Sequence, residues 1–414
     1  MTMIFNKERI KLSLRWHYEY WFRFPLYKLM LPHKVRKLRS KNTIKVLFVL
    51  TEIGPWKTKE LYKAMLVHPR FQPILGISES AELSTAKAEL INYLDELEYD
   101  YVDLDITPKL TFKKLSPDII FYQKPYDWCY QPHLLFKKHL SALFCYVAYC
   151  FHTTNLKFGL SQPLFYCVWQ QYYENDLLVT PERLSMMPDK GKQIIVTGLP
   201  IQDQLMKPKE QYQDPWKKQA RSKKRIIYAP HHTISSKYKD GLALSTFLEN
   251  ADVMLEMMHK YSDRVQWAFK PHPLLYRNLL SVWGQEKTDK YYNEWKNADN
   301  SQFEDGEYDA LFKYSDAMIH DCSSFTIEYL YTKNPVMFLV RQNGGSNPHN
   351  AFSQKADELH QKGLTKADID SFILDVINGI DPLKEEKEKF YNDSLTPPNG
   401  KTACENIINS ILGE

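Results

Sequence analysis

The 414-residue sequence lacks several features that would each indicate a class of protein. It has no apolar run of about eighteen residues, so it predicts no membrane-spanning helix, and no apolar segment typical of a signal peptide follows its basic start. No Gly-x-Gly-x-x-Gly follows the first predicted strand, which argues against a dinucleotide-dependent oxidoreductase. Its six cysteines have no paired spacing, so we expect reduced thiols in a cytosolic protein and no zinc site.

A strong charge imbalance is also missing. The formal net charge of +4 is too small to indicate nucleic-acid binding by itself. Hydrophobic residues at 43% and charged residues at 25% are ordinary for a soluble globular protein, whereas 14% aromatic residues is high. At this length two domains are expected.

The basic residues gather at the N-terminus. Residues 1–43 contain eleven Lys and Arg against Glu8 and Glu19, with eight aromatic residues interleaved. This composition suits a segment lying on an anionic membrane surface, where each cation adds about 1 kcal/mol. The alternative is a helical extension packed on its own domain, with the rings in the core and the cations in solvent. Nucleic-acid binding is less favoured, because no RNA-binding sheet follows.

From residue 44 onward, strands alternate with helices, which predicts an α/β fold of two doubly wound Rossmann-like domains. In the first half we expect a helix that follows the turn at residues 52–56 and ends at about residue 67, a second over 83–97, and an aromatic-rich third over 161–173. Strands are expected at 44–50, 71–76, 101–104, 117–122 and 143–148. The expected parts are an N-terminal extension 1–43, domains 44–205 and 225–400, a charged linker 206–224, and a C-terminal helix 401–414.

Three polar turns in the second half each follow a predicted strand, at 225–228, 265–269 and 317–319. Because the carboxyl ends of parallel strands meet at one edge of a sheet, we expect the turns to lie together. Each histidine could be structural by itself, but their shared position favours function. The residues that we expect to meet a phosphate or nucleotide here are His231, His232, Lys270, His272, Asp321, Ser323, Ser324 and Glu328.

The third turn is the most informative. Ser323 and Ser324 precede a predicted two-turn helix, a stop at 333–335 and a strand at 336–340. The free N–H groups at the start of the helix and two hydroxyls favour a phosphate or diphosphate. Glu328, one turn later, could reach a sugar hydroxyl. Alternatively, one of the serines only caps the helix.

These turns, together with residues 196–203, resemble the CDP-glycerol glycerophosphotransferase family, the teichoic-acid primases and polymerases, mainly over the C-terminal half. The resemblance implies a glycosyltransferase-B fold, with the two domains facing a cleft, the acceptor on the first domain and the nucleotide donor on the second. It also implies that His152 is the base that activates the acceptor, although Thr153 stands where the family has glycine. A histidine at this strand end could instead be structural. The loop 341–346 could close over a ligand.

The chemistry is predicted to need neither metal nor cofactor. The conspicuous Asp-x-Asp pair, Asp103 and Asp105, lies away from the phosphate turns, and we interpret it as a solvated strand end. Hydroxyls and histidines would neutralise the leaving phosphate instead, with His152 and His272 as the catalytic residues. Cys322 as a nucleophile is less favoured, because no oxyanion glycine motif adjoins it.

The sequence therefore predicts a peripheral transferase on the inner face of the bacterial plasma membrane. It would move a polyol phosphate, such as glycerol phosphate from CDP-glycerol, onto a lipid-linked or cell-surface polysaccharide. A glycosyltransferase that uses a nucleotide sugar in capsule, lipopolysaccharide or surface-polysaccharide synthesis is the alternative, since one phosphate turn serves both. A third possibility is a non-catalytic membrane-bound scaffold, and no nucleic-acid partner is expected.

Overall fold

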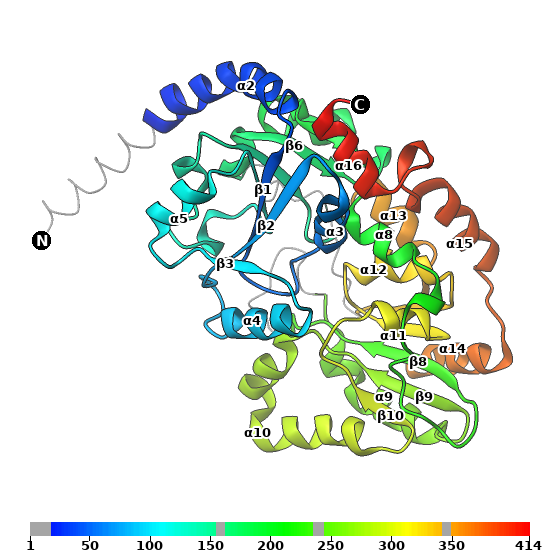
Figure 1. Cartoon of the computed structure of the whole chain (residues 1–414). Coiled ribbons are helices and arrows are strands. Elements are labelled where there is room, and N and C mark those ends of the chain that lie inside the picture. Colours follow the sequence, from blue (N-terminus) through cyan, green and yellow to red (C-terminus); the bar gives the residue numbers. More distant parts are fainter. Residues whose placement is uncertain (1–17, 155–161, 235–243, 342–348) are drawn as a thin grey trace, which may run out of the picture. The chain divides into compact units, whose positions relative to one another are not determined.

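The computed structural model describes residues 18–154, 162–234, 244–341 and 349–414 (Figure 1). Most of the loop that was expected to close over a ligand, residues 342–346, lies outside the described residues. The chain forms two compact units. Unit 1 comprises Met1–Cys150, Leu156–Asp203 and Pro397–Glu414, and unit 2 comprises Phe151–Asn155 and Gln204–Thr396.

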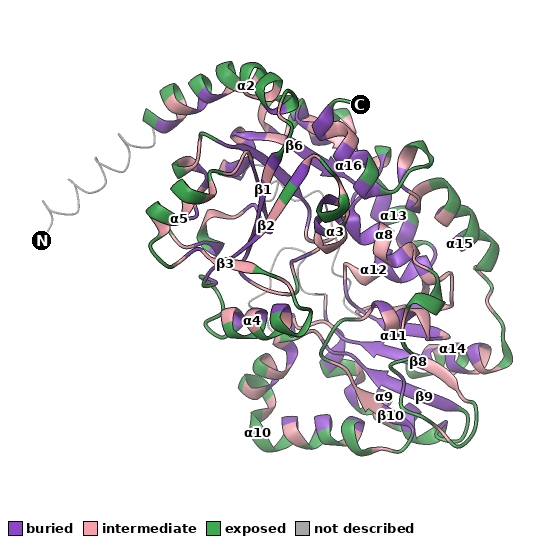
Figure 2. Ribbon diagram, in the orientation of Figure 1, coloured by how far each residue is buried: buried purple, intermediate pink, exposed green. Residues whose placement is uncertain are grey.

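Unit 1 is built on a parallel sheet of seven strands in the order β3-β2-β1-β4-β5-β6-β7. Its central strands are almost continuously apolar and buried, as in sheets that helices cover on both faces (Figure 2). The strands are β1 Ile44–Leu50, β2 Phe71–Ile77, β3 Tyr101–Asp103, β4 Ile119–Tyr122, β5 Leu143–Val147, β6 Val168–Tyr173 and β7 Ile194–Val196. The helices are α2 Phe24–Arg39, α3 Lys59–Val67, α4 Ala86–Glu96, α5 Pro108–Leu115, α7 Pro181–Ser185 and α16 Ala403–Leu412, and α8 Pro200–Met206 spans the boundary to unit 2.

The helix predicted over 161–173 is wrong. A 3-10 turn, Pro163–Tyr166, is followed by strand β6, which pairs with β5 and β7. Aromatic and β-branched side chains favour a strand when both of its faces are covered, and Tyr172 and Tyr173 are fully buried on the two faces. The aromatic content of this segment therefore reflects a core strand.

Unit 2 contains a second parallel sheet, of six strands in the order β10-β9-β8-β11-β12-β13. The 24-residue helix α10, broken at Gly284 where φ is 76°, was not predicted from the sequence. The strands are β8 Lys224–Ala229, β9 Val265–Phe269, β10 Ser301–Phe303, β11 Ala317–His320, β12 Val336–Leu339 and β13 Gln361–Gly363. The helices are α9 Phe247–Lys260, α10 Leu274–Asn297, α11 Asp309–Lys313, α12 Phe325–Glu328, α13 Ala351–Asp357, α14 Lys366–Asn378 and α15 Lys384–Phe390.

Each sheet reverses its strand order once, between β1 and β4 in unit 1 and between β8 and β11 in unit 2. In open α/β sheets, ligands bind outside the carboxyl ends of the strands at such a reversal. The predicted fold class, two doubly wound α/β domains, is confirmed. The charged stretch 206–224 belongs to unit 2, where Trp216 is buried and donates through Nε1 to the carbonyl of Leu311 (3.3 Å).

The N-terminal helix α2 and the preceding π-helical turn η1, Glu19–Arg23, are part of unit 1. Phe24 packs against Phe136, with 5.5 Å between the ring centroids, and the Tyr27 hydroxyl donates to the carbonyl of Ala142 (3.0 Å). All six cysteines are free. Among the described residues, no helix has the length and apolar character needed to cross a bilayer.

Candidate functional site

The strand reversal of unit 2 brings together the turns that follow β8 and β11. Asp321, after β11, is fully buried. Its carboxylate accepts the backbone N–H of His231 (2.5 Å) and both the N–H (2.5 Å) and hydroxyl (3.0 Å) of Thr246. Burial raises the pKa of Asp321 to about 6, while these donors act in the opposite direction. Asp321 was predicted to contact the donor, but its bonds instead fix the His231 turn to the start of α9.

Three histidines from the turns after β8 and β9 lie together. The ring centroids are 4.4 Å apart for His231 and His232, 4.1 Å for His232 and His272, and 5.1 Å for His231 and His272. In the part of the chain that is described, these are the one set of three His, Cys, Asp or Glu residues with ligand atoms within 4.8 Å of one another. The predicted convergence of these two turns therefore occurs.

The hydrogen bonds at Nδ1 assign the tautomers of two of these rings. Nδ1 of His272 accepts the backbone N–H of Leu274 (3.1 Å), so its proton lies on Nε2. The Thr233 hydroxyl lies 2.9 Å from Nδ1 of His231 and already accepts two backbone N–H groups, at 3.0 Å and 3.3 Å. Its own hydrogen is therefore directed to His231, which also leaves the His231 proton on Nε2. Asn278 supports the third ring, that of His232. Its amide nitrogen donates to the backbone carbonyl of His232 (2.9 Å) and lies 3.4 Å from Nδ1 of the same residue.

All three imidazoles are neutral at physiological pH. Burial, and then the charges that neighbouring groups would carry, lowers the pKa of His231 to about 2 and of His272 to about 3, and burial also lowers the pKa of His232. A metal bound at Nε2 would require the ring proton to lie on Nδ1. Nδ1 of His272 instead accepts a hydrogen bond, so it carries no proton. The cluster therefore presents N–H donors, which suit an anion better than a cation.

Two other residues that were predicted to contact the nucleotide donor, Lys270 and Glu328, make hydrogen bonds within unit 2. Lys270 is buried, donates to the carbonyl of Gly306 (2.7 Å) and lies over the ring of Tyr308. Glu328 is also buried and accepts a hydrogen bond from the Tyr308 hydroxyl. The contact of Glu328 with a sugar hydroxyl stays a prediction, because a carboxylate that accepts one hydrogen bond can accept others.

Ser323 and Ser324, in the third polar turn, which follows β11, are half-buried, and a short helix follows them. The predicted two-turn helix consists of one α-helical turn, α12, and a 3-10 turn, Tyr329–Thr332. Ser324 is at the N-cap position but makes no side-chain capping bond, so the capping alternative does not hold for it. The Ser323 hydroxyl lies 2.7 Å from that of Thr153.

That contact joins the His152 segment to the third turn within unit 2. The carbonyl of Thr153 accepts the N–H of Asn350 (3.1 Å) and the hydroxyl of Ser353 (2.5 Å), and the Asn350 amide donates to the carbonyl of His152. The carbonyls of His152 and Thr153 are thus both held by hydrogen bonds, and a residue with a fixed role at this turn needs such support.

Two other sequence interpretations change with the structure. Asp103 and Asp105 are not a solvated strand end, because both bind the ammonium of Lys87, at 2.9 Å and 2.7 Å. Cys322 is buried, its thiol donates to the carbonyl of Ala229, and burial raises its pKa well above the usual value. A buried neutral thiol is a poor nucleophile, so the cysteine alternative is not supported.

Sequence reasoning missed the supporting residues Thr153, Thr246 and Asn278. Thr246 precedes an apolar helix, which is a capping signal, but its bond to Asp321 joins residues 75 positions apart. Asn278 lies on the unpredicted helix α10. No local pattern indicates either contact.

Comparisons with known proteins show which family and which solved structures this chain is similar to. Residues 171–343 match the family model described as CDP-Glycerol:Poly(glycerophosphate) glycerophosphotransferase, a segment that contains the three polar turns but not His152. A search of curated proteins gives no match.

Among solved structures, the chain is similar to the wall teichoic acid polymerase TagF, with 14% identity, a TM-score of 0.54 and 98% coverage of both chains. A TagF variant soaked with CDPG gives 15% identity, a TM-score of 0.54, and 98% and 97% coverage of this chain and of TagF. A UDP-N-acetylglucosamine 2-epimerase from Listeria monocytogenes, described as putative, gives 14% identity, a TM-score of 0.56, and 90% and 96% coverage. At these identities the structures show a shared fold. Over residues 171–343 the chain is therefore similar to the CDP-glycerol glycerophosphotransferase family, and the whole chain shares its fold with TagF.

Proposed function

We propose that the protein transfers glycerol phosphate from CDP-glycerol to a hydroxyl of a lipid-linked or cell-surface polysaccharide. The observation that carries the proposal is the cluster of neutral N–H donors of His231, His232 and His272 at the ligand-binding edge of unit 2. The family match over residues 171–343 supports CDP-glycerol as the donor. The similarity to TagF, a wall teichoic acid polymerase that was soaked with CDPG, supports a role in teichoic-acid-like polymer synthesis.

In this reaction the acceptor oxygen attacks the phosphorus that carries glycerol. A new P–O bond to the acceptor forms, the P–O bond to the cytidine phosphate breaks, and CMP leaves with the electron pair. Charge that develops on the leaving phosphate would be stabilised by N–H groups of the histidine cluster and by the hydroxyl of Ser323. Because His272 is neutral, we assign it a hydrogen bond to the phosphate as its catalytic role.

His152 would take the proton from the acceptor hydroxyl. A general base must be held within hydrogen-bond reach of its substrate, and typically contributes a rate factor of about a hundred or more. Two features support this assignment: the bonds that hold the His152 backbone to Asn350, and the contact of its neighbour Thr153 with Ser323. The base would then lie beside the turn that receives the donor.

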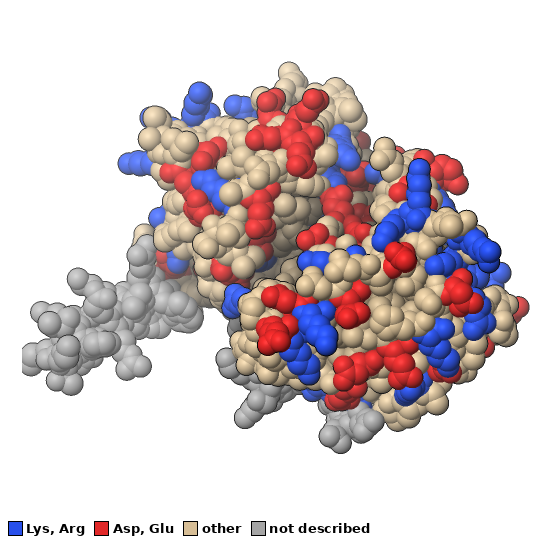
Figure 3. Space-filling view, turned by 90° about the horizontal axis from the view of Figure 1, so that it is seen from below, with Lys and Arg blue, Asp and Glu red and all other residues tan. Residues whose placement is uncertain are grey.

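We propose further that the N-terminal helix rests on an anionic membrane surface on the cytoplasmic side. Trp21, Phe22 and Leu29 are 70%, 67% and 78% exposed, whereas Phe24 and Tyr27 are buried within unit 1. Together with Tyr18, Leu26 and Met30, the exposed side chains recur at helical spacing along one face. On the molecular face shown in Figure 3, lysine and arginine lie among aspartate and glutamate.

Thermal unfolding with added nucleotides tests the donor. At a concentration of about one hundred times its dissociation constant, CDP-glycerol should stabilise the protein by about 2.7 kcal/mol. CDP-ribitol and a panel of nucleotide sugars are the comparison ligands, and Ser323→Ala and His272→Ala should each reduce the shift. Stabilisation by nucleotide sugars alone would favour the glycosyltransferase alternative, and stabilisation by none of them would favour the scaffold.

A further inference from the structure

Unit 1 has a strand reversal of its own, between β1 and β4. Glu52 follows β1 and Lys124 follows β4, so these residues occupy the place where open α/β sheets bind ligands. The donor chemistry assigned to unit 2 uses neither of them. A second binding edge is therefore available within unit 1.

A compact charged network covers this edge. Lys124 Nζ lies 2.8 Å from Glu52 Oε1 and 2.6 Å from Glu82 Oε2, and the Ser80 hydroxyl donates to the same Glu52 oxygen (2.9 Å). The side chains of Lys124 and Glu52 are each 12% exposed, whereas that of Glu82 is 40% exposed. The network thus has a fixed inner part and one carboxylate at the surface.

An adjacent network follows β2 and β3. Lys87 pairs with Asp103, Asp105 and, at 3.9 Å, with Glu79. The two networks together contain five carboxylates, two ammonium groups and the imidazole of His133, 3.0 Å from Asp105, so the carboxylates outnumber the cations. Such an edge repels a polyanion, so it disfavours a growing chain of polyol phosphates. Carboxylates are, however, good acceptors for the hydroxyl groups of a neutral ligand.

An exposed aromatic surface adjoins the carboxylates. Trp128 is 51% exposed and stacks on Tyr126, with ring centroids 4.7 Å apart and an angle of 21° between the planes. The backbone of the next residue, Cys129, accepts the N–H of Ala81 (3.4 Å), which ties this turn to the loop that carries Glu82. The aromatic stack and the surface carboxylate therefore belong to neighbouring turns of one edge.

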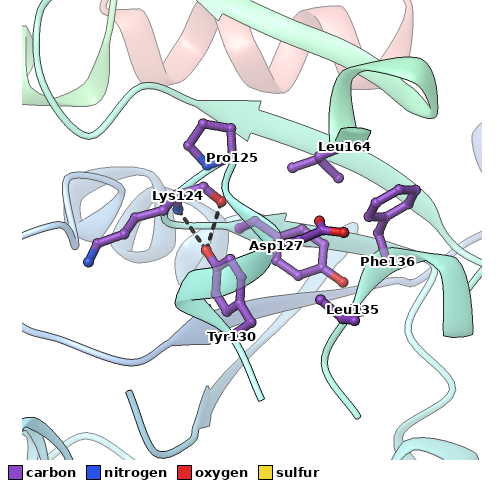
Figure 4. Close-up of a pocket in the computed structure, with 8 residues that line it drawn as sticks. Lys124, Pro125, Asp127, Tyr130, Leu135, Phe136 and Leu164 are labelled. Atoms are coloured by element: carbon purple, nitrogen blue, oxygen red, sulfur yellow. Dashed lines mark hydrogen bonds between the residues drawn. The ribbon is translucent and has the colours of Figure 1, made fainter. Parts of the chain in front are cut away.

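Hydrogen bonds fix the turn between Lys124 and Tyr130, which carries the aromatic stack. The Tyr130 hydroxyl accepts the N–H of Lys124 (2.6 Å) and donates to its carbonyl (2.9 Å), as the dashed lines in Figure 4 show. Asp127 and Phe136 line a small hollow beneath the turn (Figure 4). These bonds hold the backbone of Lys124, so the turn that leads to Trp128 is ordered before a ligand binds and loses little conformational entropy on binding.

The geometry points to a neutral sugar as the ligand of this edge. One face of a sugar ring presents C–H groups that pack on an aromatic ring, and hydroxyls around its rim can donate to carboxylates. We therefore infer that Trp128 receives the sugar face, while Glu82 and Glu52 accept its hydroxyls. This inference rests on the proposed function, which it deepens: the acceptor is engaged through an uncharged sugar, and not through a polyol-phosphate chain.

Saturation-transfer NMR on the full chain tests the inference. The probes are methyl glycosides of glucose, galactose and N-acetylglucosamine, with a glycerol phosphate trimer as the anionic comparison. We expect transfer to the ring protons of at least one glycoside. The affinity should fall about tenfold in Trp128→Ala, because the stacking surface is lost, and should be largely kept in Trp128→Phe. Leu110→Ala, which changes an exposed apolar residue elsewhere in unit 1, is the control that should bind like the wild type.

Three results would overturn the inference: no transfer to any glycoside, an affinity that is unchanged in Trp128→Ala, or Trp128-dependent binding of the glycerol phosphate trimer. The thermal shift with CDP-glycerol, measured on the same samples, separates this outcome from a failure of the proposed function. A protein that binds CDP-glycerol but no neutral sugar refutes only the acceptor inference. One that binds the sugar but no CDP-glycerol refutes only the proposed donor.

Discussion

The hydroxyl of Thr153 lies 2.7 Å from the hydroxyl of Ser323, although 170 residues separate them in the chain. Thr153 stands where the resemblance to the glycerophosphotransferases leads one to expect glycine, which has no side chain to make such a bond. Thr153 is buried and its carbonyl is held by Asn350 and Ser353, so its hydroxyl has little freedom. The orientation of the Ser323 hydroxyl in the third turn therefore depends on Thr153.

A double-mutant cycle measures this dependence. Thr153→Val and Ser323→Ala should each destabilise the protein, but their combined effect should be smaller than the sum by about 1 kcal/mol, the net value of one hydrogen bond. Urea unfolding of the four proteins gives the coupling free energy. Additive effects, within about 0.5 kcal/mol, would mean that the contact contributes nothing to stability.

Much of this arrangement could be predicted from local patterns. Apolar runs with polar ends located β8, β9 and β11 within a residue or two, and the shared edge of parallel strands then brought the histidine turns together. By contrast, β6 was mistaken for a helix, because an aromatic run fits either a buried strand or a helix face.

The supporting bonds of the site could not be predicted. Asp321 carries no sequence signal that distinguishes a ligand contact from a buried bond to Thr246, because that bond depends on how β11 and α9 pack. The same holds for Thr153 and Ser323, whose contact depends on the path of a segment far away in the chain. Sequence patterns therefore located the turns, while tertiary packing decides which side chains face a ligand.

The two histidines with proposed catalytic roles should respond differently to substitution. His272→Ala should weaken CDP-glycerol binding, because a hydrogen bond to a charged phosphate is worth about 1.5–3 kcal/mol. His152→Ala should leave donor affinity nearly unchanged and lower turnover about a hundredfold or more. Donor dissociation constants and turnover numbers, measured together, separate the two effects. Full turnover in His152→Ala would place the base elsewhere, and a loss of folding would make His152 structural.

The histidine cluster should prefer an anion to a metal ion. Its Nδ1 atoms at His231 and His272 accept hydrogen bonds, which leaves N–H groups at Nε2. Inorganic pyrophosphate should therefore raise the melting temperature, and zinc or nickel ions should bind weakly in calorimetry. Transfer activity should persist in excess chelator. Activity that is lost with chelator and restored by magnesium would show that a metal neutralises the donor phosphate.

Buried neutral histidines should make the protein sensitive to acid. Burial lowers the pKa of His231 to about 2, and of His272 and His320 to about 3, from 6.5. Below pH 6.5 the unfolded chain binds protons that the folded protein does not, so the free energy of unfolding falls as the pH falls. At pH 5 each such histidine costs about 2 kcal/mol. Asp321 acts in the opposite direction, because its raised pKa of about 6 lets the folded state bind a proton first.

Urea unfolding between pH 7 and pH 5 checks the sign and the size of this effect. The wild type should lose stability steadily over this range. His320→Phe, which keeps a ring of similar size in the core, should reduce the slope by up to one proton. An unchanged slope in this variant, or a wild type that gains stability toward pH 5, would contradict the assignment of His320 as a buried neutral group.

The exposed face of the N-terminal helix should govern membrane binding. Replacing Trp21, Phe22 and Leu29 by serine removes three largely exposed apolar side chains without touching Phe24 or Tyr27, which pack on unit 1. The variant should therefore fold normally but no longer sediment with vesicles that contain anionic lipid, because the apolar contact with the acyl chains is lost.

Wild-type binding should weaken at high salt, since the cations of the segment contribute about 1 kcal/mol each at low ionic strength. Serine substitutions at the exposed Ile106 and Leu110, elsewhere in unit 1, are the matched control and should leave sedimentation unchanged. Sedimentation that persists in the helix variant, or that is insensitive to salt in the wild type, would mean that this helix does not hold the protein at the membrane.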